Sequence, residues 1–218
     1  MSQHLCSYGG VSTRRQTLSR TESSFMRATG PNQPGQILLD VRDCLNELGI
    51  AYAVIGALAV SYYGIPRSTS DADAVIWLKD TQITSGDLTK RLGLAGFNAE
   101  LKRGDLEDPV VGAIAVEDRH QNRVDLLLGL RGMDPEAIGR CLESPLLDST
   151  VRIIAAEDLI AMKIFAGSFR DLEDVRGILQ VSGDQLNLDL LRKLARRYGP
   201  AVAKKLEDFL QEPPLPTE

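Results

Sequence analysis

Asp71 and Asp73 are the two residues whose type and spacing most clearly indicate chemistry. They alternate with Ala72 and Ala74 in a run that is typical of a β-strand. Side chains at positions i and i+2 of a strand point to the same face, so the two carboxylates project together. Because carboxylates held this close repel each other unless a cation lies between them, the pair predicts a metal site.

A glycine turn comes before this pair. Gly56 follows an apolar strand and begins a short helix. Glycine at such a turn lets backbone N–H groups and the N-terminus of the next helix approach phosphate oxygens. Gly56, Asp71 and Asp73 together predict a site for a nucleoside triphosphate and Mg²⁺.

The order of these parts resembles the nucleotidyltransferase superfamily with the DNA polymerase β-like fold. The signature of that superfamily is a hydrophobic strand, Gly followed by Gly or Ser, roughly ten residues, and then Asp-x-Asp or Asp-x-Glu on the next strand. This chain supplies Ile55, Gly56, Asp71 and Asp73, and it carries Ala57 where the superfamily has Gly or Ser. Ala57 keeps its backbone donor but has no hydroxyl, which predicts weaker phosphate binding.

The resemblance implies nucleotidyl transfer, for which two Mg²⁺ ions about 3.5–4 Å apart need three converging carboxylates. Asp125 lies in an otherwise apolar strand, where a charge is costly to bury unless it shares a metal. By the resemblance, Asp71 and Asp73 bind both ions. Asp125 binds the catalytic ion and helps to deprotonate the acceptor hydroxyl. These three are the predicted catalytic and metal-binding residues.

Each predicted ligand also has a structural interpretation. Asp71 can cap or shape the turn that follows residues 68–70, and Asp125 can pair with Arg123 or Arg67 at a strand end. The metal interpretation is favoured because the glycine turn and the spacing agree with it.

The loop before the aspartate pair matches the pattern Arg-x-Thr-x-Asp-x-Asp that the superfamily often shows. Arg67 is predicted to bind phosphate oxygens through its guanidinium, and Ser70 through its hydroxyl. A surface arginine and a serine that only shapes the turn are the alternatives.

A second block contains Lys163, Asp171 and Asp174. It resembles the Lys…Arg-Asp-x-x-Asp element of the abortive-infection (AbiEii-type) nucleotidyltransferase toxins and their uncharacterised relatives. Lys163 is predicted to reach phosphates from a helix, with Asp171 and Asp174 supporting the site from one helix face. The alternative is that the aspartates favourably charge a helix N-terminus while Lys163 extends to solvent. The two blocks extend the resemblance over residues 36–181.

The hydrophobic pattern predicts an α/β (α+β) fold, with a small mixed sheet, flanking helices and a helical C-terminal part. Strands are expected at residues 51–56, 72–78, 97–102, 110–116 and 123–129, and helices at 36–48, 57–64 and 82–93. From Pro135 onward helices are expected, at 156–167, 171–181, 187–198 and 200–211, interrupted by an extended piece at 150–154. The predicted divisions are a flexible N-terminal extension (1–34), a nucleotidyltransferase core (35–132), a helical part (133–211) and a tail (212–218).

Composition narrows the class of protein. The chain has 218 residues and a net charge of −5, so a nucleic-acid partner would need a local basic patch. Three distant cysteines support neither a disulfide framework nor a zinc site, and no apolar run is long enough for a membrane span. A cytoplasmic protein is therefore expected. Six cations late in the chain can face an RNA backbone or simply solvent: Arg192, Lys193, Arg196, Arg197, Lys204 and Lys205.

These observations favour a Mg²⁺-dependent enzyme that transfers a nucleoside monophosphate from an NTP to a hydroxyl. The AbiEii-type resemblance implies tRNA as acceptor and an antitoxin as partner. Adenylylation of an aminoglycoside and a noncatalytic nucleotide-binding or complex-forming protein remain as alternatives. Convergence of Asp71, Asp73 and Asp125 discriminates the enzyme from the binding protein.

Overall fold

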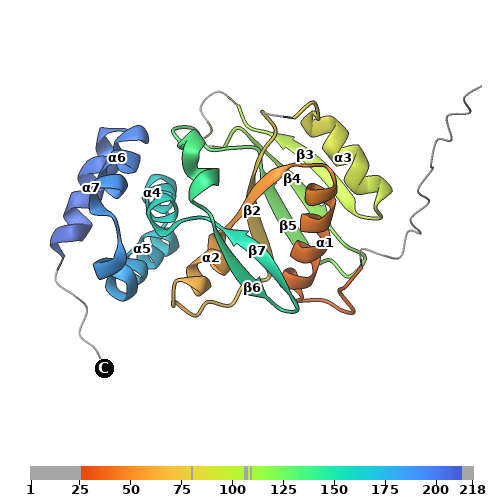
Figure 1. The fold of residues 1–218 in the computed structure, drawn as a ribbon, viewed down its shortest axis with the longest axis horizontal. Coiled ribbons are helices and arrows are strands. Elements are labelled where there is room, and N and C mark those ends of the chain that lie inside the picture. Colours follow the sequence, from red (N-terminus) through yellow and green to blue (C-terminus); the bar gives the residue numbers. More distant parts are fainter. Residues whose placement is uncertain (1–25, 80, 106–107, 109, 213–218) are drawn as a thin grey trace, which may run out of the picture.

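The computed structural model describes residues 26–79, 81–105, 108 and 110–212, which form a seven-stranded mixed sheet and its helices (Figure 1). The strand order is β3-β4-β5-β2-β1-β7-β6. The strands are β1 (Ala51–Ile55), β2 (Asp71–Trp77), β3 (Asn98–Arg103), β4 (Gly112–Glu117), β5 (Arg123–Leu127), β6 (Leu142–Leu146) and β7 (Ser149–Ile153). The helices are α1 (Pro34–Glu47), α2 (Gly56–Tyr62), α3 (Ser85–Leu94), α4 (Ala156–Ala166), α5 (Phe169–Ser182), α6 (Leu188–Arg197) and α7 (Pro200–Gln211), with 3₁₀ turns at Pro135–Arg140 and Gly183–Gln185. The predicted fold class is confirmed.

The middle of the sheet positions the predicted site. Strand β2 lies between β1, to which it is antiparallel, and β5, to which it is parallel. In this register Asp73 lies beside Asp125 on one side and beside Ile55 on the other. Neighbouring residues in register share a sheet face, so Asp73 and Asp125 project to the same side.

The buried residues explain why these strands hold their positions. Helix α1 places Ile37, Leu38, Val41 and Leu45 in the core, at the helical spacing seen in the sequence. It contacts β1, β2 and β5. Since the core side chains fix the register of β2 and β5, they also fix which face carries the carboxylates.

The prediction that helices follow Pro135, interrupted only at 150–154, is wrong for residues 142–149. The hairpin β6–β7 extends the sheet there, and β7 runs parallel to β1 with Ile153 opposite Val54. The predicted extended piece at 150–154 is confirmed as β7. Strand β6 gave little signal because it contains Pro145, which is tolerated on an edge strand, and has no apolar alternation.

The N-terminal segment predicted as flexible (1–34) is described only from residue 26, and residues 1–25 lie outside the described part. Residues 26–33 contact the core. The backbone N–H of Arg27 donates to Asp40 Oδ2 (2.9 Å), and its guanidinium binds Asp40 and Asp43. The backbone N–H of Gln33 donates to Asn122 Oδ1 (2.7 Å). These contacts order the chain up to the start of α1.

The four C-terminal helices lie together at one end of the molecule (Figure 1). Helix α4 is buried along most of its length and contacts α5, α6 and α7. It ends at Gly167, whose φ of +70° suits glycine and whose N–H donates to the carbonyl of Lys163. Among the described residues no helix is long and apolar enough to cross a membrane. Of the predicted tail, residues 213–218 lie outside the described part.

Candidate active site

Gly56 and Asp73 are in direct contact where β1 turns into α2. Gly56 has a φ of +63°, and a Cβ added there would lie 2.0 Å from Oδ2 of Asp73. Both the backbone conformation and the close approach therefore require glycine. The first N–H groups of α2 have no acceptor within the helix. They lie at this turn, next to the Asp73 carboxylate. Ala57 contributes only its backbone here, because its side chain is buried.

The electrostatics of Asp73 show that the predicted charges have been brought together. Burial raises the pKa of Asp73 to about 6, and the carboxylates of Asp71 and Asp125 add to this rise. Lys163 and Arg67 oppose it. Charges from three separate stretches of sequence thus affect the pKa of Asp73.

Asp71 and Asp125 each have a further partner. Thr69 Oγ1 donates to Asp71 Oδ1 at 2.8 Å, which steadies the turn before β2, while Ser70 beside it is exposed. Arg123 donates from Nε and Nη2 to Asp125 Oδ1, at 2.9 and 2.8 Å. The pairing of Asp125 with Arg123 that the sequence offered as an alternative is therefore present.

The carboxylates of Asp71, Asp73 and Asp125 are the candidate ligands of a divalent cation. Oxygen donors are those that Mg²⁺ prefers, and the raised pKa of Asp73 is the effect that a nearby cation would relieve. In the part of the chain that the structure describes, however, no group of three or more acidic, His or Cys side chains is arranged to hold a metal. Asp125 points an oxygen at Arg123 instead. The donor set therefore fits Mg²⁺ in kind, but among the described residues the three side chains are not arranged as a metal site, and one Asp125 oxygen is bound to Arg123.

Lys163, Arg67 and the two supporting aspartates form a network across α4, α5 and the loop before β2. Lys163 Nζ lies 2.9 Å from Asp171 Oδ1 and 2.8 Å from Asp174 Oδ2. Arg67 Nη1 binds the same Asp174 oxygen. Lys163 is only 6% exposed, so the alternative in which it extends to solvent is wrong.

Ser168 is a member of this network that the sequence did not single out. As the N-cap of α5, its hydroxyl donates to Asp171 Oδ2 at 2.5 Å and accepts from the backbone N–H of Asp171 at 3.1 Å. Against the effect of burial, the hydrogen bonds from Ser168 and Lys163 lower the pKa of Asp171. A serine three residues before an aspartate is a recognisable capping signal. Ser168 thus caps the helix, and the Asp171 carboxylate binds both Ser168 and Lys163.

Removing the charge of Asp174 should destabilise the protein. We expect Asp174→Asn to lower the free energy of unfolding by about 3 kcal/mol, because two partly buried cations lose their shared carboxylate. Urea unfolding at neutral pH measures this change. Glu173→Gln is the matched control, since Glu173 lies on the same helix in an exposed pair with Arg176, and it should change stability by less than about 0.5 kcal/mol. Equal effects of the two variants would contradict the proposed burial effect.

A family model described as "Nucleotidyl transferase of unknown function (DUF2204)" matches residues 35–212, and the chain belongs to this family. No curated protein matches the chain in a sequence comparison.

Solved structures share the fold at low sequence identity. A nucleotidyltransferase-like antigenic protein from Paracoccidioides brasiliensis is 18% identical with a TM-score of 0.51, over 84% of this chain and 89% of that one. ANT(2'')-Ia in complex with adenylyl-2''-tobramycin is 13% identical with a TM-score of 0.54, over 76% of this chain and 98% of that one. At these identities the similarity shows a common fold.

Proposed function

We propose that this nucleotidyltransferase moves a nucleoside monophosphate from an NTP to an acceptor hydroxyl, with Mg²⁺ held by Asp71, Asp73 and Asp125. One observation carries the proposal. Asp73 is packed against Gly56, and its pKa is raised to about 6 by burial and by Asp71 and Asp125. A site that gathers negative charge in this way favours binding of a divalent cation.

In the proposed reaction the acceptor oxygen bonds to the α-phosphorus as the bond to the pyrophosphate oxygen breaks. The acceptor proton goes to Asp125, whose Oδ1 accepts hydrogen bonds from Arg123. Mg²⁺ would neutralise charge on the phosphates. Arg67 and Lys163 supply the remaining positive charge for the triphosphate, together with the backbone of Gly56 and Ala57 and the hydroxyl of Ser70.

For the acceptor we propose RNA, with tRNA as the sharpest candidate. Support comes from the resemblance of residues 36–181 to AbiEii-type toxins and from the basic residues late in the chain. A toxin of this kind would act in the cytoplasm and would be restrained by an antitoxin protein.

A second candidate acceptor is an aminoglycoside. ANT(2'')-Ia, whose structure contains an adenylylated tobramycin, has a similar fold. An acidic surface beside the carboxylates would suit a cationic drug, whereas a basic one would suit RNA.

The test is to incubate the protein with each α-labelled NTP, Mg²⁺, and either total RNA, protein or an aminoglycoside. Label on one acceptor class identifies it, and Asp71→Ala/Asp73→Ala should remove the label. Asp148→Ala/Asp184→Ala is the matched control, because it also removes two carboxylates, both exposed and distant in sequence from the site. If no acceptor gains label that depends on Asp71 and Asp73, a noncatalytic nucleotide-binding protein becomes the better proposal.

A further inference from the structure

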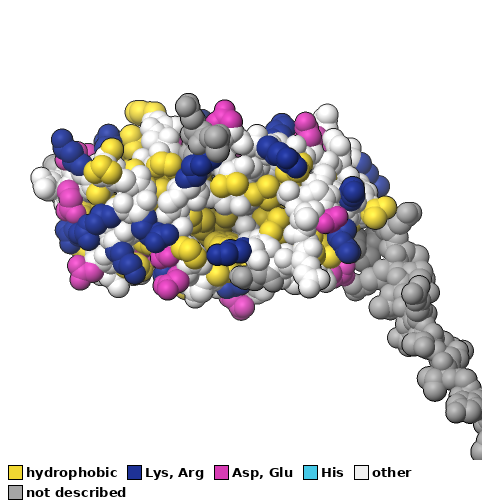
Figure 2. All heavy atoms as spheres, turned by 90° about the horizontal axis from the view of Figure 1, so that it is seen from above, with side chains coloured by type: hydrophobic (Ala, Val, Ile, Leu, Met, Phe, Trp, Pro, Cys, Tyr) yellow, Lys and Arg dark blue, Asp and Glu magenta, His cyan; other side chains and the backbone are white. Residues whose placement is uncertain are grey.

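Positive charge is concentrated in the helix pair α6–α7. Residues 192–205 contain six Lys or Arg and no Asp or Glu, while the rest of the chain has 19 basic and 30 acidic residues. Figure 2 shows several Lys and Arg side chains at the end of the molecule where these helices lie, with Asp and Glu side chains among them. The rest of the chain is strongly acidic by comparison, so a polyanion would be attracted to this end.

Packing does not require these cations. Helix α6 buries Leu191, Leu194 and Ala195, and α7 buries Val202, Leu206 and Phe209. The basic residues lie on the opposite, solvent-facing sides, where five of the six are exposed. Apolar residues form the buried contact between the helices, so exposed cations that make no ion pair are available for a partner.

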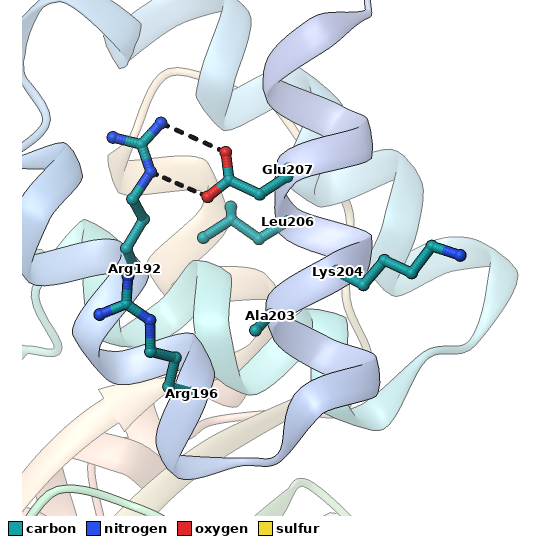
Figure 3. Close-up of a pocket in the computed structure, with 6 residues that line it drawn as sticks. All are labelled: Arg192, Arg196, Ala203, Lys204, Leu206 and Glu207. Carbon is teal, nitrogen blue, oxygen red and sulfur yellow. Dashed lines mark hydrogen bonds and ion pairs between the residues drawn. The ribbon is translucent and has the colours of Figure 1, made fainter.

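Among the described residues, five of the six cations form no ion pair with a carboxylate, and one of these five, Lys205, lies over the Phe209 ring at 5.8 Å. Arg192 is neutralised by Glu207 (Nε to Oε1, 2.8 Å), as Figure 3 shows, and Arg197 donates to the carbonyls of Gly132 and Met133. Among the described residues, Lys193, Arg196 and Lys204 form no ion pair. Arg196 lines a hollow of about 260 Å³ between the helices, and Lys204 extends from the outer side of α7 (Figure 3).

We propose that Lys193, Arg196 and Lys204, the α6–α7 basic surface, bind the phosphate backbone of RNA. Unpaired, exposed cations on rigid helices suit phosphates, to which Lys and Arg give sequence-independent affinity. Base stacking is not part of the surface, because Tyr198 between the helices packs on Phe165, with ring centroids 4.8 Å apart. This inference rests on the proposed function, because the RNA bound at this surface would supply the acceptor hydroxyl.

The experiment compares the full chain with Lys193→Gln/Arg196→Gln/Lys204→Gln. Binding of a labelled single-stranded RNA is followed by fluorescence anisotropy between 50 and 200 mM salt, without NTP. For single strands, the slope of log affinity against log salt is about −0.7 per phosphate contacted, so the variant should lose about 2 from the slope. We expect its affinity at 50 mM salt to fall at least about tenfold.

Lys90→Gln/Arg91→Gln/Arg103→Gln is the matched control, because it removes three exposed cations from the other end of the sheet. It should bind RNA like the wild type. Equal binding by all three proteins, or no binding by the wild type at 50 mM salt, would overturn the inference. So would self-association of the wild type, seen by light scattering and lost in the α6–α7 variant, without RNA binding, because the partner would then be a second copy.

The same proteins separate this inference from the proposed function. RNA binding that survives in Asp71→Ala/Asp73→Ala, with no transfer by the wild type to any acceptor, would leave the surface standing and remove the proposed activity. Transfer to RNA that is equally fast in the α6–α7 variant would keep the activity and overturn the surface.

Discussion

Asp73→Asn should abolish nucleotide transfer while the protein stays folded. Asp73 is the carboxylate in contact with Gly56 and flanked by Asp71 and Asp125, so its loss removes a ligand from the centre of the proposed Mg²⁺ site. Metal ions contribute several kcal/mol to such reactions, so we expect transfer to fall by about 10³-fold or more. Label transfer from an α-labelled NTP measures it. Retention of more than about a tenth of the activity would remove Asp73 from the catalytic role.

The same substitution should make the protein more stable at neutral pH when divalent cations are absent. The pKa of Asp73 is raised to about 6 in the folded chain, from an ordinary value near 4. The ionised carboxylate therefore destabilises the folded state by an amount that is absent below about pH 4, grows as the pH rises to about 6 and stays at about 1–3 kcal/mol above it. Asparagine carries no such charge.

Urea unfolding of wild type and Asp73→Asn, in a chelator and from pH 4 to pH 8, measures this difference. The variant should gain stability over the wild type as the pH rises. Mg²⁺ should then stabilise the wild type more than the variant. Parallel pH profiles for the two proteins would show that Asp73 is not under electrostatic strain.

Gly56→Ala should cost both stability and activity. A Cβ at this position would overlap Asp73 Oδ2, and the φ of +63° disfavours any side chain. We expect the free energy of unfolding to fall by about 2–4 kcal/mol and transfer to fall by about 100-fold, because Asp73 must move. Urea unfolding and label transfer measure the two effects.

Gly49→Ala separates the effect of the positive φ from the effect of overlap with Asp73. Gly49 has nearly the same φ, +65°, but an added Cβ would have no neighbour within 4 Å. This control should lose about 1 kcal/mol and keep its activity. If Gly56→Ala and Gly49→Ala had the same stability and the same transfer activity, the contact between Gly56 and Asp73 would not be important for function.

The part of the site that the sequence predicted is the part that local geometry determines. The alternation of Asp71 and Asp73 in a strand and the single Asp125 in an apolar strand place the residues on one face, and the core fixes the register between the strands. Gly56 follows from the turn that its position requires.

What the sequence left open depends on contacts between distant segments. Nothing local shows that Asp174 would meet Arg67, 107 residues earlier, or that β6, with Pro145, would join the sheet. The choice of Asp125 between a metal and Arg123 was likewise open, because both explain a charge in that strand. Such choices are decided by packing and by long-range charge.

The carboxylate of Asp174 occupies the two cations, Arg67 and Lys163, that the triphosphate would need. Under the proposed function, this carboxylate on α5 would take the place of a phosphate group until the nucleotide binds. A nucleotide bound there would compete with a tethered anion at high local concentration, so its apparent affinity would include the cost of displacing Asp174. Release of Asp174 would also break the ion pair that joins α5 to the loop before β2. Binding of a nucleotide would then loosen the attachment of the C-terminal helices to this loop.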